Sequence, residues 1–61
     1  MTEYDKIFTV YTHAFSYPVA MPPDVTINDV WQHERYKFRL NETVTIQNEQ
    51  GKQKTFVKRS V

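Results

Sequence analysis

Residues 36–58 read YKFRLNETVTIQNEQGKQKTFVK, and they carry the clearest structural pattern in the chain. From Tyr36 to Gln47, apolar side chains take the even positions and polar side chains the odd ones, with Glu42 as the exception. Successive side chains of a strand point to opposite faces of a sheet, so this alternation is typical of a half-buried antiparallel strand. We therefore predict a strand over residues 36–47 that can kink near Glu42.

The only glycine of the chain, Gly51, indicates how the chain turns back after this strand. A three-residue loop with Gly51 in the left-handed conformation pairs Asn48 with Lys52, whereas a four-residue loop shifts the pairing by one residue. The three-residue loop gives the better cross-strand matches. These matches are Val44–Phe56, Thr45–Thr55, Gln47–Gln53 and Glu42–Lys58. We therefore predict an antiparallel hairpin of residues 43–47 and 53–57 in this register.

Residues 6–17 are rich in β-branched and aromatic side chains, which predicts a further strand. Their apolar side chains occur at both odd and even positions. Such a strand is either central and covered on both faces, or has one face covered by another subunit. Proline cannot donate a hydrogen bond to a neighbouring strand, so we expect Pro18, Pro22 and Pro23 to end this strand and residues 18–25 to form a loop.

A short helix is predicted after the loop. Thr26 and Asp29 have the spacing of a capping box, in which an aspartate replaces the preferred glutamate or glutamine. The residues that then follow at helical spacing are Ile27, Val30, Trp31 and Glu34. A helix of one to two turns is too short to be stable alone, so Trp31 should pack against the sheet.

The predicted architecture is a small, β-rich α+β domain that comprises residues 1–61. It combines an N-terminal strand, a proline loop, a short helix and a C-terminal hairpin. These form either a three-stranded antiparallel sheet with the helix on one face or a small open barrel. A chain of 61 residues buries only about 60% of its unfolded surface and is marginally stable, so we expect a homodimer.

The composition argues against several classes of protein. The chain has no cysteine for a disulfide or a thiolate metal site, and one glycine is too few for a glycine-rich phosphate loop. Its two histidines, His13 and His33, do not belong to a compact set of metal ligands. No nucleophilic side chain lies in a sequence motif that supplies a general base to activate it. We therefore predict a non-enzymatic protein without metal or cofactor. No apolar window suits a signal peptide or a membrane span, and we expect a cytoplasmic protein.

Charge is unevenly distributed along the chain, although the net charge is only +1. Residues 1–34 hold five acids and one base (−4), whereas residues 35–61 hold seven bases and two acids (+5). Strong nucleic-acid binders usually have a pI above about 9, and the pI of this chain is about 8.0. Attraction between the two halves, within one chain or between two, is therefore the favoured interpretation.

The candidate partner-binding residues form two groups. Four cations are expected on the solvent face of the hairpin: Arg35, Lys37, Arg39 and Arg59. Met21 and Trp31 belong to an apolar cluster in the proline loop and the helix, and both residue types are enriched at protein interfaces. For Trp31, packing in the core is slightly favoured over partner binding. Met21 is the better candidate for an exposed contact.

These features predict a small protein-interaction module, such as an inhibitor or accessory factor that binds a partner protein with an acidic surface. The first alternative is a nucleic-acid-binding protein that contacts the phosphate backbone through the basic face of the hairpin. A second, lower-ranked alternative is a structural subunit of a larger assembly. Base stacking is not expected, because Tyr36 and Phe38 would point away from that face.

Overall fold

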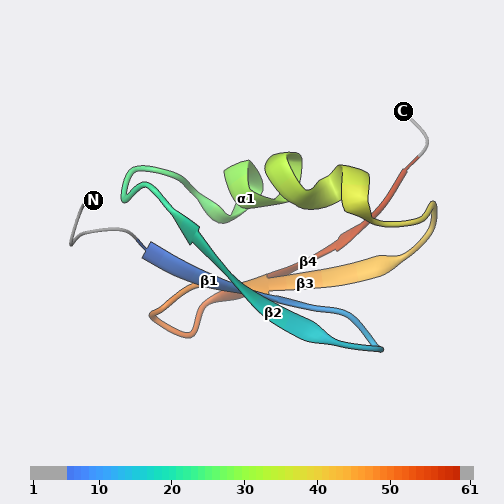
Figure 1. Ribbon diagram of the computed structural model, residues 1–61, viewed down its shortest axis with the longest axis horizontal. Coiled ribbons are helices and arrows are strands. Elements are labelled where there is room, and N and C mark those ends of the chain that lie inside the picture. Colours follow the sequence, from blue (N-terminus) through green and yellow to red (C-terminus); the bar gives the residue numbers. More distant parts are fainter. Residues whose placement is uncertain (1–5, 60–61) are drawn as a thin grey trace.

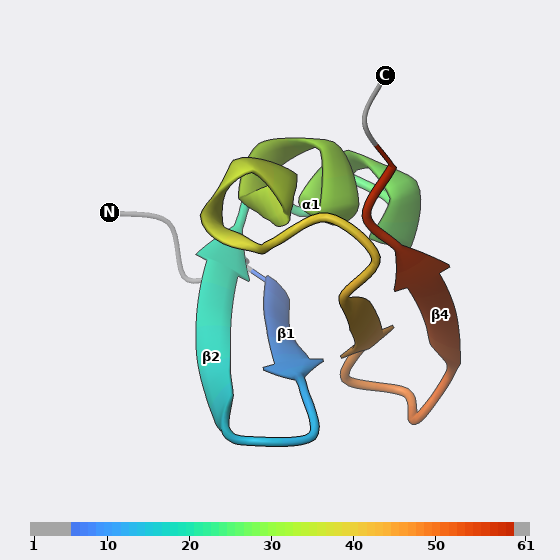
Figure 2. The same ribbon diagram turned by 90° about the vertical axis from the view of Figure 1, so that its right-hand side faces the viewer.

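The structure, a computed structural model, describes residues 6–59. The elements in chain order are β1 (Lys6–Tyr11), β2 (Ser16–Met21), α1 (Ile27–Glu34), the 3-10 helix η1 (Arg35–Lys37), β3 (Thr43–Gln47) and β4 (Gln53–Val57). The strands form an open antiparallel sheet in the order β2-β1-β3-β4, and α1 lies across one face of it (Figure 1). Figure 2 shows the same two layers from the end. The predicted β-rich α+β fold is confirmed, with four strands instead of three and an open sheet instead of a barrel.

The C-terminal hairpin has the predicted bounds and register. Its paired residues include Val44–Phe56, Thr45–Thr55 and Gln47–Gln53. The N–H of Asn48 donates to the carbonyl oxygen of Lys52 at 2.8 Å, which closes the loop at the predicted pair. Gly51 has a φ of +87°, in the left-handed region that favours glycine. The alternation and the single glycine were sufficient to predict this hairpin.

We expect Gly51→Val to lower the free energy of unfolding by about 1 kcal/mol or more, because a β-branched residue is strained at positive φ. Apart from its chain neighbours, the nearest atom to a Cβ added here is Gln47 Nε2 at 4.0 Å, so the cost is conformational rather than steric. Urea unfolding of the wild type, Gly51→Val and Gly51→Asn measures this cost. Asparagine tolerates positive φ and should retain most of the stability. Equal stability of the two variants would contradict the explanation.

The segment before β3 is not a strand, which corrects the prediction for residues 36–42. Helix α1 ends at Glu34 and passes directly into η1, so the chain makes another helical turn. Lys37 Nζ lies 2.9 Å from the Glu34 carboxylate one turn back, an ion pair at a spacing that stabilises helical turns. The chain then enters a turn in which Asn41 has a φ of 68°. Strand β3 consequently begins only at Thr43.

The N-terminal half forms a hairpin where a single strand and a loop were predicted. The chain turns back at Thr12, whose Oγ1 accepts two backbone N–H hydrogen bonds at 3.1 Å, and β2 then pairs with the whole of β1. The prediction of a loop over residues 18–25 is therefore wrong for residues 18–21. Pro18 is tolerated because β2 is an edge strand. A missing N–H on the side of the strand that faces away from β1 removes no hydrogen bond of the sheet.

Strand β1 lies in the middle of the sheet, but the described residues cover only one of its faces. Phe8 and Val10 are buried on the side of α1. Ile7 and Tyr11 point to the opposite side, which we call the outer face, and are 43% and 38% exposed. Of the two predicted alternatives, coverage of both faces is not found within residues 6–59, and coverage of one face by another subunit stays a prediction.

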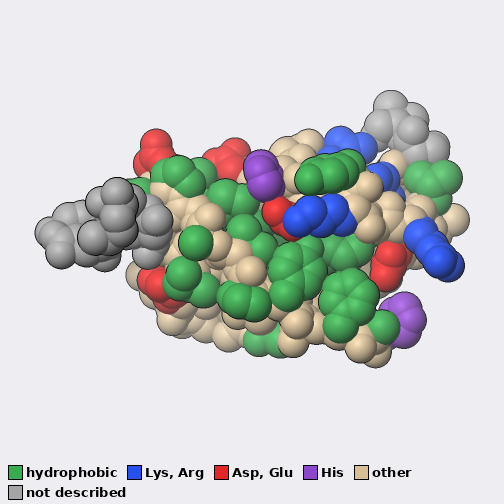
Figure 3. Space-filling view, viewed as in Figure 1, with side chains coloured by type: hydrophobic (Ala, Val, Ile, Leu, Met, Phe, Trp, Pro, Cys, Tyr) green, Lys and Arg blue, Asp and Glu red, His purple; other side chains and the backbone are tan. Residues whose placement is uncertain are grey.

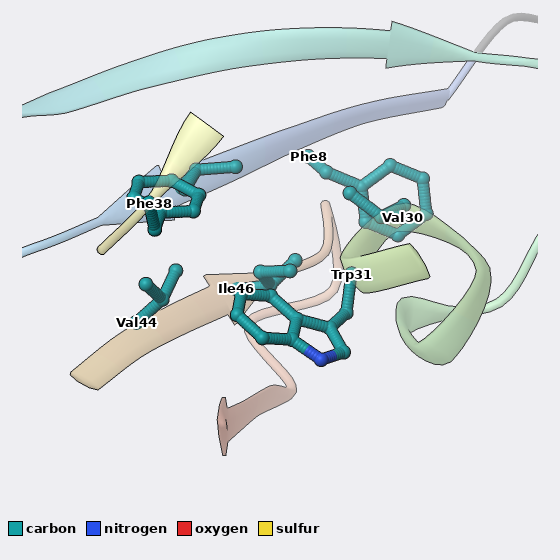
Figure 4. Close-up of a cluster of buried hydrophobic side chains, with 7 residues drawn as sticks. Phe8, Val30, Trp31, Phe38, Val44 and Ile46 are labelled. Carbon is teal, nitrogen blue, oxygen red and sulfur yellow. The ribbon is translucent and has the colours of Figure 1, made fainter. Parts of the chain in front are cut away.

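Helix α1 begins with the predicted capping box. The N–H of Asp29 donates to Thr26 Oγ1 at 3.3 Å, and the N–H of Thr26 donates to the Asp29 carboxylate at 3.0 Å. The helix places Trp31 over the sheet, where its ring stacks on Phe38 and Phe56 with centroids 6.1 and 5.1 Å away. Trp31 is 7% exposed, so the prediction of core packing is confirmed. Figure 4 shows the core around it, which consists of Phe8, Val10, Val30, Trp31, Phe38, Val44 and Ile46.

Candidate functional site

The four candidate cations do not share a face of the sheet. Arg35 and Lys37 lie on η1. Arg39 lies in the loop that precedes β3, and Arg59 follows β4. The prediction of a basic face on the hairpin is wrong, because it depended on a strand that continued back to residue 36. Only Lys37 and Arg39 lie together beside a groove, which is described below.

The two apolar candidates are held by the core. Trp31 is buried, so its ring is not available to a partner. Met21 is half-buried and packs against the core cluster, which corrects the prediction of an exposed contact. Both residues are therefore structural in the described part of the chain.

Glu34 is the one buried charged side chain among residues 6–59, with 2% of it exposed. Its carboxylate accepts from Tyr17 Oη at 2.9 Å, contacts His33 Nδ1 at 2.8 Å and pairs with Lys37 Nζ at 2.9 Å. Burial by itself raises the pKa of a carboxyl group, but the hydrogen bonds from Lys37, His33 and Tyr17 outweigh it, and the pKa of Glu34 is lowered. The ionised carboxylate thus joins β2 to the end of α1.

Lys37 connects this buried carboxylate to the surface. The hydrogen bond to Glu34 raises the pKa of Lys37, so its ammonium stays protonated. Lys37 Nζ lies 5.7 Å from the ring centroid of Tyr17 and 6.0 Å from that of Tyr36, within range of cation–π attraction. Burial, and then the hydrogen bond to Glu34, raise the pKa of the Tyr17 hydroxyl, which stays neutral. A large part of the Lys37 charge is therefore balanced inside the protein.

A groove of about 500 Å³ lies between the β1–β2 turn and the loop that precedes β3, and we call it the end groove. Its lining comes from residues 13–15 and 37–42. Phe15 and Leu40 in this lining are 53% and 57% exposed, and neighbouring Tyr36 is 70% exposed. Figure 3 shows hydrophobic side chains gathered over β2 and the turn before it, with Lys or Arg side chains nearby. The end groove thus combines exposed apolar surface with cations.

Sequence reasoning missed two apolar residues that line this groove, Phe15 and Leu40, and the exposure of neighbouring Tyr36. The sequence pattern places Phe15 in a strand, and it places Tyr36 and Leu40 on the buried face of the strand predicted over residues 36–47. The i, i+3 spacing of Glu34 and Lys37 was visible in the sequence and is a signal for an ion pair on a helical turn. The contact of Tyr17 with Glu34 spans 17 residues and leaves no such local signal.

Two carboxylates are associated with the end groove: Glu42 lines it, and Glu34 pairs with Lys37 of the lining. The Glu34 carboxylate has three polar partners from β2, α1 and η1, so it helps to hold these elements together. Within residues 6–59, no three side chains of the metal-ligating types lie together, and no helix is long and apolar enough to cross a membrane. Comparison with models of protein families, with curated proteins and with solved structures gave no match.

Proposed function

We propose that this protein is a protein-binding module that contacts its partner through the end groove. The observation that carries the proposal is the exposure of two large apolar side chains, Phe15 and Leu40, in the lining of this groove together with Lys37 and Arg39. Large apolar side chains that are exposed together, with arginine among them, are characteristic of protein interfaces. A module of this size acts by covering a surface of its partner, as an inhibitor or an accessory factor does.

The groove also suggests the chemistry of the partner. An apolar side chain of the partner would fit between Phe15 and Leu40, which both line the groove. The exposed Arg39 favours an acidic neighbour of that side chain, whereas Lys37 already shares its charge with Glu34. We therefore propose a partner segment with an apolar anchor and an adjacent acid.

Binding of single-stranded nucleic acid is the second candidate. The exposed ring of Tyr36 favours it, because single-strand binders combine stacking aromatic rings with cations. Two observations weaken it: the acidic Glu42 lines the end groove, and the ammonium of Lys37 is paired with Glu34. Protein binding therefore remains the leading proposal.

Homodimer formation and a cytoplasmic location remain predictions. Since Trp31 is buried, the surface best suited to self-association is the outer face of the sheet. The residues that point outward from its four strands are uncharged and include Ile7, Tyr11 and Val57, all at least one-third exposed.

The end groove is tested by selecting binding peptides from a random peptide library displayed on phage. We expect selected peptides to contain an apolar residue beside an acid and to shift the amide signals of residues 14–15 and 37–42 in NMR spectra. The variant Phe15→Ser/Leu40→Ser should weaken their binding by about tenfold or more, since central apolar contacts dominate binding energy.

Ile7→Ser is the matched control, because Ile7 is a similarly exposed apolar residue on the outer face, away from the groove. It should leave peptide binding unchanged. The proposal would be refuted if both variants lost peptide affinity equally, or if the peptides shifted NMR signals outside residues 14–15 and 37–42. If no peptide is selected and oligothymidylate binds with loss on Tyr36→Ser, the second candidate replaces the first.

A further inference from the structure

Strand β4 leaves one side of its backbone unpaired by the described residues. It is the last strand in the sheet order, and among residues 6–59 only β3 pairs with it. The N–H of Asn48 donates to Lys52, and the N–H of Lys58 donates to Glu42 at 3.0 Å, so positions 52 and 58 direct backbone groups toward β3. Hydrogen-bonded pairs alternate along an antiparallel ladder. The backbone groups of Gln53, Thr55 and Val57 therefore point outward from the sheet.

The two edges of the sheet differ in their capacity to accept another strand. On the β2 edge, the N–H of Thr12 donates to the carbonyl oxygen of Phe15 at 2.8 Å, and the same alternation turns Pro18 outward. Proline has no N–H, so this edge is interrupted in its middle. The β4 edge contains no proline. It is the edge at which a further strand can form a continuous ladder.

The β4 edge is strongly basic. Residues 52–59 contain four cations and no acid: Lys52, Lys54, Lys58 and Arg59. The cations at 52, 54 and 58 have the same parity as Phe56, whose ring stacks on Trp31 of α1. They therefore project on the helix side of the sheet. Lys54 Nζ lies 3.4 Å from Asn28 of α1, in agreement with this placement.

A second copy of β4 would be a poor occupant of this edge. If two copies of β4 pair antiparallel about a two-fold axis at Thr55, Lys52 of each copy lies opposite Lys58 of the other. An axis at Lys54 places the Lys54 residues of the two copies opposite each other. A pairing centred on Phe56 places Lys54 opposite Lys58. Like charges directly opposite each other destabilise a strand pair, and edge lysines are a common protection against self-pairing. The same cations attract an acidic strand.

We propose that β4 accepts an extended acidic segment of a partner protein as an antiparallel fifth strand. The outward groups of Gln53, Thr55 and Val57 supply the ladder, and main-chain hydrogen bonds of this kind give affinity in strand addition. Acidic side chains of the segment lie opposite Lys52 and Lys54, and an apolar side chain lies opposite Phe56. Lys58 borders the end groove through its hydrogen bonds to Asn41 and Glu42, but Gln53, Thr55, Val57, Lys52 and Lys54 lie outside the groove lining. Either proposal can therefore fail without the other.

The probe is a synthetic peptide, acetyl-ETVTETE-amide, whose first residue is placed opposite Lys58 and whose last is placed opposite Lys52. Its acids then face the lysines, and its valine faces Phe56. We expect titration to shift the NMR signals of residues 52–58 and to slow hydrogen exchange at the amides of Thr55 and Val57. The peptide KTVTKTK, in which lysines replace the acids, should not bind.

N-methylation separates strand pairing from charge attraction. Methyl groups on residues 2, 4 and 6 of the peptide remove the N–H groups that face β4, and binding should weaken about tenfold or more. Methyl groups on residues 3, 5 and 7 face away and should leave binding unchanged. Equal binding of the two methylated peptides would overturn the proposal.

Two variants of the protein complete the test. Thr55→Pro removes an outward N–H in the way that Pro18 does on β2, and it should abolish peptide binding while circular dichroism shows that the sheet is retained. Lys52→Glu should weaken binding several-fold, whereas its matched control Lys6→Glu on β1 should not. Phe15→Ser/Leu40→Ser, which disrupts the end groove, should bind the peptide normally.

Three outcomes would refute the proposed fifth strand. The first is a set of peptide-induced shifts centred on the end groove or on the outer face. The second is protection of the Thr55 amide that increases with protein concentration without peptide, which would make a second copy the occupant. The third is binding of a DNA oligonucleotide, but not of the acidic peptide, to residues 52–59.

Discussion

Replacing Trp31 by alanine is expected to lower the free energy of unfolding by about 3–5 kcal/mol, the usual cost of removing a large aromatic ring from a core. The indole connects three parts of the chain, because it extends from α1 and stacks on Phe38 and on Phe56 of β4. Domains are typically stable by about 0.05–0.15 kcal/mol per residue, or about 3–9 kcal/mol for this length. The substitution should therefore remove between about one-third and all of the stability, and if the wild-type stability lies at the lower end of its range, the variant is unfolded at room temperature.

Tyr36→Ala is the matched control for this experiment. It also removes an aromatic ring, but Tyr36 is 70% exposed, and exposed substitutions usually change stability by less than about 0.5 kcal/mol. Far-ultraviolet circular dichroism and urea unfolding distinguish the two variants. A folded Trp31→Ala protein with nearly wild-type stability would show that the helix layer contributes little to the fold.

Glu34→Gln is expected to lower the free energy of unfolding at neutral pH by about 1–3 kcal/mol, since it removes a buried ionised acceptor from three partners. The loss stays below that for a fully buried ion pair, because Lys37 is about half exposed and can be solvated when its partner is removed. Tyr17→Phe, which deletes one of the three hydrogen bonds, should have a smaller effect in the same direction.

The same substitution should change how stability depends on pH. The pKa of Glu34 is lowered from its ordinary value of 4.5 in the folded protein, so ionised Glu34 stabilises the fold. This contribution is complete above about pH 4.5 and is lost as the pH falls through the lower pKa of the folded state. Wild-type stability should therefore fall more steeply on acidification below that pH than the stability of Glu34→Gln.

Urea unfolding at a series of pH values measures this difference. Asp24→Asn serves as the control, because Asp24 is an exposed carboxylate in the loop between β2 and α1. It should leave the slope with pH nearly unchanged. Parallel pH profiles of the wild type and Glu34→Gln would exclude the buried carboxylate as a source of acid sensitivity.

The local elements were predictable because their causes are local. The C-terminal hairpin follows from alternation and from one glycine at positive φ, and the start of α1 follows from the spacing of Thr26 and Asp29. The errors occurred where a local pattern had two explanations. Pro18 signals a strand end in the chain, but it is also acceptable in an edge strand, and only the sheet order shows which applies.

The candidate site was less predictable than the fold, since its residues come together only in the tertiary structure. Phe15 lies at a hairpin tip that the sequence pattern did not reveal, and Leu40 lies in a loop that the pattern presented as strand. Lys58, expected to meet the Glu42 side chain, instead donates through Nζ to the carbonyl oxygens of Arg35 and Phe38 at 2.7 and 3.5 Å. The Glu42 carboxylate accepts from the N–H of Arg39 at 3.1 Å.

The sequence alone therefore determined the fold class, the register of the β3–β4 hairpin and the helix cap, because each depends on the pattern of side chains a few residues apart. Only the tertiary structure decided which strands are edges, where Lys37 directs its charge and which apolar residues stay exposed. The physical reason is that these properties depend on contacts such as Tyr17 with Glu34, between residues distant along the chain. A pattern of neighbouring residues carries no record of such contacts.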